Sequence, residues 1–179
     1  MRRLSLITFS LTVVAIFSLE ASLLHGQMAA PSFTLKDLNG VRFSLSDFKG
    51  KTILLDFFAT WCRPCKEEIP HLQALAKTYP NDTLLIISIS EDASFIEDSL
   101  VKAYVKDNGI TWIVARDTDA VAYKYDVYEY PTIILIDQEG NIRARYVGLT
   151  EKEVLEQRIK VIIPEFNMPA LVMTLTLAA

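Results

Sequence analysis

Hydrophobic and polar residues alternate in the first third of the chain in a way that predicts strands. Two short alternating stretches, 33–35 and 41–44, flank Asn39-Gly40, and that dipeptide is a strong signal for a β-hairpin. A nearly continuous apolar run then spans 51–59, which is typical of a strand buried on both faces. Because Asp56 is the only acid in this run, we expect its carboxyl group to be buried as well.

The middle of the chain changes to helical spacing. Apolar side chains recur about one helical turn apart after residue 62, and Pro80 ends the pattern. These positions are Ile69, Leu72, Leu75, Ala76 and Tyr79. Residues 84–89 predict a second buried strand, and the capping-box pattern Ser94-Phe-Ile-Glu97 predicts a helix that runs to Asn108.

The last third repeats this alternation. The sequence predicts a short strand over 112–115, a short helix over 118–125, and a hairpin of strands over 132–137 and 142–147. A second capping box over 150–153 predicts a final helix. Its predicted apolar face consists of Val154, Leu155, Ile159, Ile162 and Ile163. Strands that alternate with helices indicate an α/β fold with a mixed sheet.

The two ends of the chain differ from the part between them. Arg2 and Arg3 precede an apolar run, as the basic and hydrophobic regions do in a secretory signal. No clear cleavage site follows, so residues 1–26 are either a cleaved signal peptide or an N-terminal anchor. We expect one globular domain over 27–163 and an apolar C-terminal tail over 164–179, whose role the sequence does not indicate.

Composition and charge narrow the function classes. The 179 residues carry a formal net charge of -4, and no cluster of Lys or Arg lies beyond the N-terminal pair, which argues against nucleic-acid binding. Hydrophobic residues make up 51% of the chain, enough to bury a sizeable core. Only Cys62 and Cys65 are present, so no wider disulfide framework holds the fold together.

The two cysteines lie where the predicted buried strand ends and a helix begins. Backbone N–H groups and the positive end of the helix dipole favour a thiolate at Cys62, and the adjacent Arg63 adds a positive charge. Cys65 follows about one turn later and can attack Cys62 within a mixed disulfide. Pro64 suits the first turn of a helix. We therefore predict a redox-active disulfide, with Cys62 as nucleophile and Cys65 as resolving thiol, and no other cofactor.

Two other interpretations of the pair stay open at this point. The cysteines can form a purely structural disulfide, or they can remain as free thiols in the core. A closed metal site needs more ligands, and only His25 and His71 offer soft nitrogen atoms. His25 lies in the predicted targeting segment, so we expect no metal, and we expect His71 on the surface of its helix.

The segment Asp56-Phe-Phe-Ala-Thr-Trp-Cys-Arg-Pro-Cys-Lys-Glu-Glu-Ile-Pro70 resembles the active-site segment of thioredoxin-like proteins of the TlpA/ResA type. The resemblance extends over about 31–163 and includes the N-terminal hairpin and Tyr130-Pro131. It implies a thioredoxin fold, in which helices flank a central mixed sheet and an N-terminal β-hairpin is added. It also implies that Pro131 follows a cis peptide bond and faces the cysteines.

The resemblance further implies a groove for an extended substrate segment. Tyr130 lies just before the predicted cis-proline, and Trp61 and Gly148 are expected to edge the same groove. Arg63 and Pro64, between the cysteines, are expected at the same surface. From the residues alone, Trp61 can equally be a packing residue, and Gly148 can simply end the last strand.

Two carboxyl groups are candidates for proton transfer with Cys65. Asp56 matches the buried acid of thioredoxin, and burial on a central strand should raise its pKa. Many TlpA/ResA-type proteins resemble this chain but carry Asn there, and they place a functional acid shortly after the second cysteine, a position that Glu68 matches. We expect Asp56 to be the more important acid, because Glu68 on an amphipathic helix is expected to face water.

The function that the resemblance implies is the reduction of disulfides in exported proteins such as apocytochrome c, with electrons from a membrane-bound thiol donor. We then expect a monomer outside the cytoplasm, in the periplasm or at the outer face of the cytoplasmic membrane. A disulfide oxidase or isomerase is the first alternative. Pro64 argues against it, because the strong oxidants carry His at that position.

Two further classes of protein, a peroxidase and a copper(I)-binding protein, are each judged by a few diagnostic residues. A peroxiredoxin-like peroxidase shares the Pro31-Ser-Phe-Thr-Leu opening, but it requires Thr three residues before the nucleophile, where this chain has Ala59. A copper(I)-binding thioredoxin-like protein would use the two thiolates. Proteins of that kind space their cysteines more widely and add a downstream His, and no His follows His71.

Overall fold

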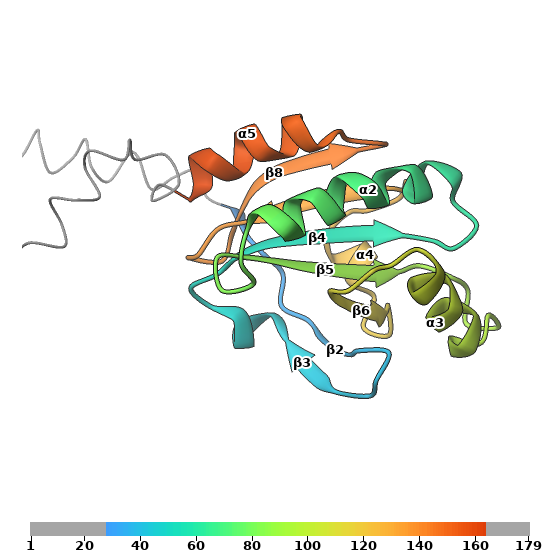
Figure 1. Ribbon diagram of the computed structural model, residues 1–179. Helices are drawn as coiled ribbons and strands as arrows, with labels where there is room; N and C mark the ends of the chain where they lie inside the picture. The colour runs from blue at the N-terminus through green and yellow to red at the C-terminus, as the bar shows by residue number, and fades with distance from the viewer. Residues whose placement is uncertain (1–27, 164–179) are drawn as a thin grey trace, which may run out of the picture.

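A computed structural model describes residues 28–163, which form a six-stranded sheet, a separate hairpin and the flanking helices (Figure 1). In spatial order the strands of the sheet are β1 (Met28–Ala29), β8 (Asn141–Val147), β7 (Thr132–Ile136), β4 (Thr52–Phe58), β5 (Leu84–Ser90) and β6 (Ile113–Arg116). The hairpin consists of β2 (Thr34–Lys36) and β3 (Arg42–Ser44), and the 3-10 helix η1 (Leu45–Phe48) follows it. The α-helices are α2 (Arg63–Thr78), α3 (Asp98–Asp107), α4 (Val121–Lys124) and α5 (Lys152–Ile162).

The sheet is mixed, as the sequence predicts. β4 pairs in parallel with β5 and antiparallel with β7, while β5 and β6 are parallel and β7 and β8 antiparallel. All seven positions of β4 are buried, which its continuous apolar run predicts for a central strand. Since β4 and β5 are parallel, the loops that follow them emerge at the same end of the sheet, and the cysteines lie in the first of these loops.

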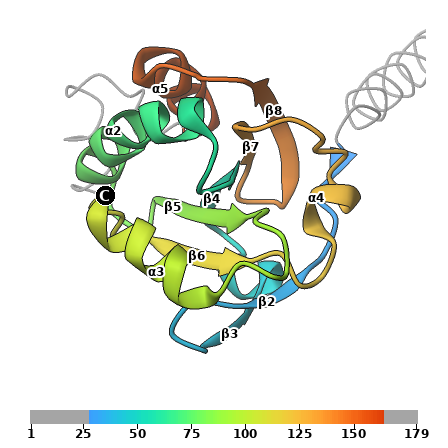
Figure 2. The same cartoon turned by 90° about the vertical axis from the view of Figure 1, so that its right-hand side faces the viewer.

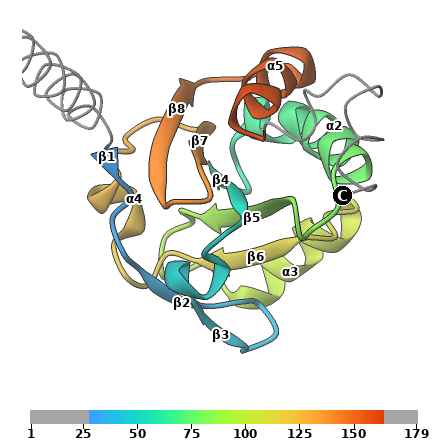
Figure 3. The same cartoon turned by 90° about the vertical axis from the view of Figure 1, so that its left-hand side faces the viewer.

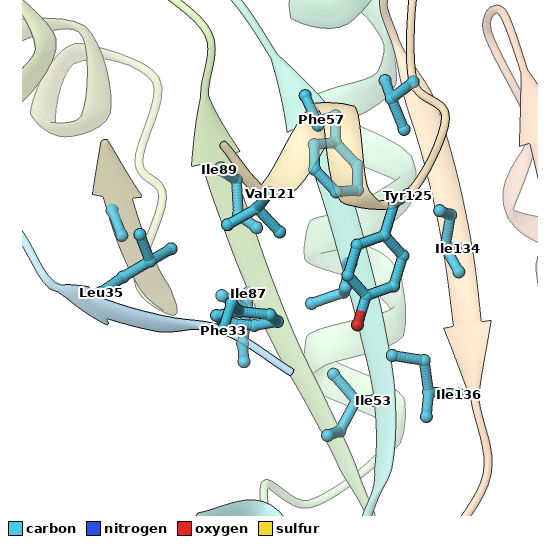
Figure 4. Packing of buried hydrophobic residues seen from close by; sticks show 14 of the residues in the cluster. Phe33, Leu35, Ile53, Phe57, Ile87, Ile89, Val121, Tyr125, Ile134 and Ile136 are labelled. Carbon is cyan, nitrogen blue, oxygen red and sulfur yellow. The ribbon is translucent and has the colours of Figure 1, made fainter. Parts of the chain in front are cut away.

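Helices and the hairpin cover the two faces of the sheet (Figures 2 and 3). Side chains of α2, α3 and α5 pack on one face, whereas α4 and the β2–β3 hairpin pack on the other. On the hairpin side, the ring of Tyr125 lies 6.3 Å from that of Phe33 and 6.0 Å from that of Phe57, measured between centroids (Figure 4). The Tyr125 hydroxyl also donates to the carbonyl of Pro31 at 2.8 Å. The predicted N-terminal extension is therefore part of the core.

The helix α3 begins later than its predicted capping box. Its N-cap residue is Glu97, and Ser94 lies in a loop before it. That loop is held by the guanidinium group of Arg116 at the end of β6, which donates to three of its carbonyl groups. These carbonyls belong to Asp92, Ala93 and Ile96. A long-range side chain thus holds the first residues of the predicted capping box in a loop, and α3 begins after them without a side-chain cap.

The start of α5 also differs from the prediction. The helix begins at Lys152, and the Thr150 hydroxyl donates to the carbonyl of Gly148 at 3.0 Å instead of capping the helix. The N–H of Lys152 donates to Nδ1 of His71 on α2 at 3.2 Å. The first turn of α5 is therefore capped by a neighbouring helix, and His71 is half-buried rather than fully on the surface.

The other predicted elements are present within a few residues of their expected bounds. Val154, expected on the apolar face of α5, is 45% exposed, because Leu155 and Ile159 occupy the stripe that faces the sheet. The sequence did not predict β1 or η1. Among the described residues no helix is long and apolar enough to cross a membrane. The predicted targeting segment, 1–26, and the predicted tail, 164–179, lie outside the described residues.

Candidate redox site

The two cysteines form a disulfide where β4 leads into α2, with their Cα atoms 5.3 Å apart. Cys62 is the N-cap residue of α2, and the N–H of Cys65 donates to its sulfur at 3.2 Å. Helix N-terminal N–H groups have no partner within the helix, so this donor stabilises negative charge on Cys62 once the disulfide is reduced. Pro64 lies in the first turn of α2, as predicted. The geometry therefore distinguishes Cys62 from Cys65 as the site of the thiolate.

Neither solvent exposure nor the charge of Arg63 distinguishes Cys62 from Cys65 as the site of the thiolate. The residues Cys62 and Cys65 are 5% and 4% exposed in the disulfide form. Arg63, which we expected to add a positive charge beside Cys62, is almost fully exposed, and its Nε lies 3.0 Å from Oε1 of Glu67. Because Glu67 and solvent screen this guanidinium group, the helix N-terminus favours the Cys62 thiolate more than Arg63 does.

The loop before the cysteines is held by a residue that the sequence analysis did not select. The carboxylate of Asp92, which is buried after β5, accepts from the N–H of Thr60 at 3.1 Å and from its hydroxyl at 2.7 Å. The N–H of Cys62 donates to the carbonyl of Ala59 at 3.1 Å. These bonds fix the backbone that presents the disulfide.

The residues expected along a substrate groove lie close together. The Tyr130-Pro131 peptide bond is cis, as predicted. Trp61 is 70% exposed, and its ring lies 6.2 Å from that of Tyr130 in an edge-to-face arrangement, so it is a surface residue and not part of the core. Gly148 adopts a φ of +83°, which favours glycine, and its N–H donates to the carbonyl of Pro131 at 2.8 Å. The arrangement joins the last strand to the cis-proline.

Asp56 is buried on β4, as its position in the apolar run predicts. Leu54 and Phe58, its neighbours on the same face, pack beneath α2, so the Asp56 carboxyl group points toward the helix that carries Cys65. Burial raises the pKa of Asp56 to about 6, although the Ser88 hydroxyl, which donates to its Oδ2 at 2.6 Å, opposes that rise. Asp56 is therefore mostly ionised at neutral pH.

Glu68 does not face water, which corrects the expectation from the sequence. It is 1% exposed, compared with 6% for Asp56. Its Oε1 accepts from the N–H of Thr150 at 2.8 Å, and its buried Oε2 has no hydrogen-bond partner. Burial, and then the nearby charge of Asp56, raises the pKa of Glu68 to about 8. The segment before α5 covers this face of α2, so Glu68 is buried where an isolated amphipathic helix would expose it.

The hydrogen bonds around Glu68 connect it to the cis-proline. Thr150 binds Glu68 through its N–H and the carbonyl of Gly148 through its hydroxyl, and Gly148 in turn binds Pro131. Glu68 also follows Cys65 by one helical turn, on the same side of α2. One acid is thus placed between the resolving cysteine and the loop that edges the cis-proline.

A third perturbed carboxyl group lies at the same end of the sheet and was also missed. Glu91 follows β5, and its N–H donates to the carbonyl of Phe58 at 2.8 Å. Burial, and then the charge and hydrogen bonding of Asp117, raises the pKa of Glu91 to about 8. Burial, followed by the charges of these two acids, also raises the pKa of Tyr130. The polar end of an otherwise apolar strand is the only sequence signal for Glu91.

The described residues offer few ligands for a metal ion. Among these residues, no group of three His, Cys, Asp or Glu side chains is arranged to hold a metal ion. His71 is oriented toward α5, where its Nδ1 accepts from Lys152, and His25 lies outside the described residues.

Comparison with known proteins agrees with this site. Residues 27–145 match the AhpC/TSA family. The chain is 35% identical to the thioredoxin-like protein YneN of Bacillus subtilis over 78% of this chain and 81% of that protein. It is 37% identical to the thiol-disulfide oxidoreductase ResA of Bacillus cereus over 83% of this chain and 84% of that protein. A crystal structure from Chlorobium tepidum, described as a thiol:disulfide interchange protein DsbE, superposes with a TM-score of 0.70 at 28% identity, covering 76% of this chain and 96% of that one.

Proposed function

Because the chain belongs to the AhpC/TSA family and is a thiol-disulfide oxidoreductase of the ResA and DsbE type, we propose that it reduces disulfides in exported proteins. The proposed location is outside the cytoplasm, which the basic and apolar pattern of residues 1–26 supports. The proposed electron source is a membrane-bound thiol donor, and the proposed substrates include apocytochrome c, as in the TlpA/ResA-type proteins that the active-site segment resembles.

The observation that carries this proposal is a Cys-x-x-Cys disulfide at a helix N-terminus beside two buried carboxyl groups, those of Asp56 and Glu68. In the reduced protein, the Cys62 thiolate attacks a substrate disulfide, forms a mixed disulfide and releases one substrate sulfur as a thiolate. Cys65 then loses its proton and attacks the Cys62 sulfur, which closes the Cys62–Cys65 disulfide and releases the second substrate sulfur. The substrate gains two electrons from the cysteine pair; Cys65 gives up one proton, and the second proton that converts both substrate sulfurs to thiols comes from another acid or from solvent.

The two acids can divide the proton transfers between them. Asp56, with a pKa of about 6, is mainly a carboxylate at pH 7 and can accept the Cys65 proton. Glu68, with a pKa of about 8, is mainly protonated at that pH and can supply a proton to the departing substrate sulfur. Environments that separate two pKa values in this way are typical of acid and base partners.

The reduction potential of the Cys62–Cys65 couple tests the direction of the reaction. We expect a potential more negative than about -180 mV, the value for a protein disulfide isomerase, because Pro64 and not His lies between the cysteines. Equilibration with glutathione or dithiothreitol buffers measures it, and reduction of insulin disulfides by the reduced protein checks the activity. A potential near about -120 mV, that of a strong oxidant, would assign the protein to the oxidases instead.

A further inference from the structure

A series of hydrogen-bonded side chains runs from the residue before β6, through β5, to β4 and toward the redox site. Ser88 on β5 is fully buried, and its hydroxyl donates to Oδ2 of Asp56 on β4 at 2.6 Å. The indole Nε1–H of Trp112, just before β6, donates to the Ser88 oxygen at 2.8 Å. β5 is apolar up to this serine, so a hydroxyl at this depth needs a partner of its own.

The chemistry of the three groups fixes the direction in which these hydrogen bonds are donated. An indole N–H can only donate, and a serine hydroxyl has one proton to give. With Trp112 donating to the Ser88 oxygen, the serine proton is directed to the Asp56 carboxyl group. Consecutive hydrogen bonds of this kind strengthen one another in a low-dielectric interior. The two hydrogen bonds therefore hold the Asp56 carboxyl group as an acceptor and favour its ionised form.

The other groups that act on Asp56 do not provide a donor. Glu68 from α2 and Tyr104 from α3 interact with its charge, while Ile133 is its apolar neighbour on β7. The buried Tyr104 hydroxyl makes no hydrogen bond. Ser88 is thus the donor to Asp56 within residues 28–163.

We propose that Ser88 and Trp112 are positioning residues that orient the Asp56 carboxyl group as the proton acceptor for Cys65. Neither residue contacts the reacting sulfurs, and both act through Asp56. The inference rests on the proposed function, since it requires the step in which Cys65 loses a proton. It goes beyond that function by assigning a role to two residues that the Cys-x-x-Cys segment does not contain.

The test combines a titration with a rate in variants of the full chain. Ser88→Ala removes the donor to Asp56, and Trp112→Phe removes the donor to Ser88 while keeping an aromatic ring. Tyr104→Phe is the matched control, because it removes a buried hydroxyl that interacts with Asp56 without a hydrogen bond. Carbon-13 NMR of the Asp56 carboxyl group gives its titration midpoint in the oxidised protein. The decay of a trapped mixed disulfide across pH gives the rate of release.

We expect the Asp56 midpoint to rise by about one pH unit in Ser88→Ala, by less in Trp112→Phe, and not at all in Tyr104→Phe. The acidic limb of the release rate should move by the same amounts. An unchanged Asp56 midpoint in a folded Ser88→Ala protein overturns the inference. A shifted midpoint with an unshifted rate also overturns it, because Asp56 then does not take the Cys65 proton. Failure of the proposed reductase function is a separate result, an oxidising potential of the wild-type protein.

Discussion

Asp56 and Glu68 occupy two sides of the same interior, and each is nearly inaccessible to solvent. Asp56 lies on the central strand and receives a hydroxyl from Ser88, whereas Glu68 lies on α2 and receives one backbone N–H while its second oxygen has no partner. Burial raises both pKa values, to about 6 for Asp56 and about 8 for Glu68. Burial thus raises the pKa of both carboxyl groups, and hydrogen-bond donors and neighbouring charges determine how far each pKa rises.

The two groups also influence each other. The charge on Asp56 contributes to the raised pKa of Glu68, so ionising one carboxyl group makes it harder to ionise the other. Near neutral pH, the state that satisfies both environments places the proton on Glu68 and the charge on Asp56. The titrations of two such groups are coupled, so replacing one carboxyl group changes the titration midpoint of the other.

The largest expected effect tests whether Cys65 is the source of the proton that Asp56 accepts. Cys65→Ser should trap the mixed disulfide and lower turnover on the order of 10³-fold or more, because the resolving thiol is absent. Mass spectrometry of the trapped complex measures this. On the Cys65→Ser background, Asp56→Asn should leave the rate of the first attack unchanged. A slower first attack would mean that Asp56 acts on Cys62 instead.

The second prediction compares the two acids directly. Asp56→Asn should slow release from the mixed disulfide by about 10²-fold at pH 8, and the difference should vanish below about pH 6, where wild-type Asp56 is protonated. Glu68→Gln should show the reverse dependence, with its largest effect below about pH 8. Stopped-flow measurement of release across pH distinguishes them. If the release rates of both variants, each divided by the wild-type rate, changed in the same direction with pH, Asp56 and Glu68 would not act as base and acid.

The third prediction concerns stability. The folded-state pKa of Glu68 is raised from 4.5 to about 8, so the folded protein holds this proton more tightly than the unfolded chain. Its contribution is present below the unfolded value and is lost as the pH rises to about 8. The free energy of unfolding of Glu68→Gln, relative to wild type, should therefore rise between pH 5 and pH 9 by on the order of 3 kcal/mol.

Urea unfolding at several pH values measures this effect. For Asp56→Asn the same gain should be smaller and confined to the interval from about pH 4 to pH 6, because its pKa is raised from 3.8 to about 6. A gain that is independent of pH in Glu68→Gln would mean that the folded protein does not hold a proton at this position.

The smallest expected effect separates the structural contribution of α2 from its chemistry. His71 and Glu68 both accept N–H groups at the start of α5, but Glu68 lies about one helical turn after Cys65 and His71 lies about two. His71→Ala should cost about 1 kcal/mol of unfolding free energy and leave the release rate unchanged. Lys77→Ala, at an exposed position of the same helix, is the control and should cost less. A changed release rate in His71→Ala would show that the α5 contact itself controls the chemistry.

Local signals in the sequence were sufficient for the strand–helix junction that carries the cysteines and for the burial of Asp56. Each depends on residues within a few positions. The prediction that Glu68 faces water was wrong, because the burial of Glu68 depends on Thr150, which is 82 residues away. The two capping boxes also failed because of distant contacts: Arg116 holds the loop before α3 through its carbonyl groups, and His71 caps the start of α5.

The roles of Asp56 as base and Glu68 as acid are tested by a site-resolved titration of both carboxyl groups in the oxidised wild-type protein. Carbon-13 NMR follows the side-chain carboxyl carbons, and Asp56→Asn and Glu68→Gln assign the two signals. We expect Asp56 to titrate first, near pH 6, and Glu68 later, near pH 8. The midpoint of Glu68 should fall when Asp56 is replaced by Asn. Midpoints in the reverse order, or two midpoints near the ordinary values of about 4, would contradict the division into base and acid.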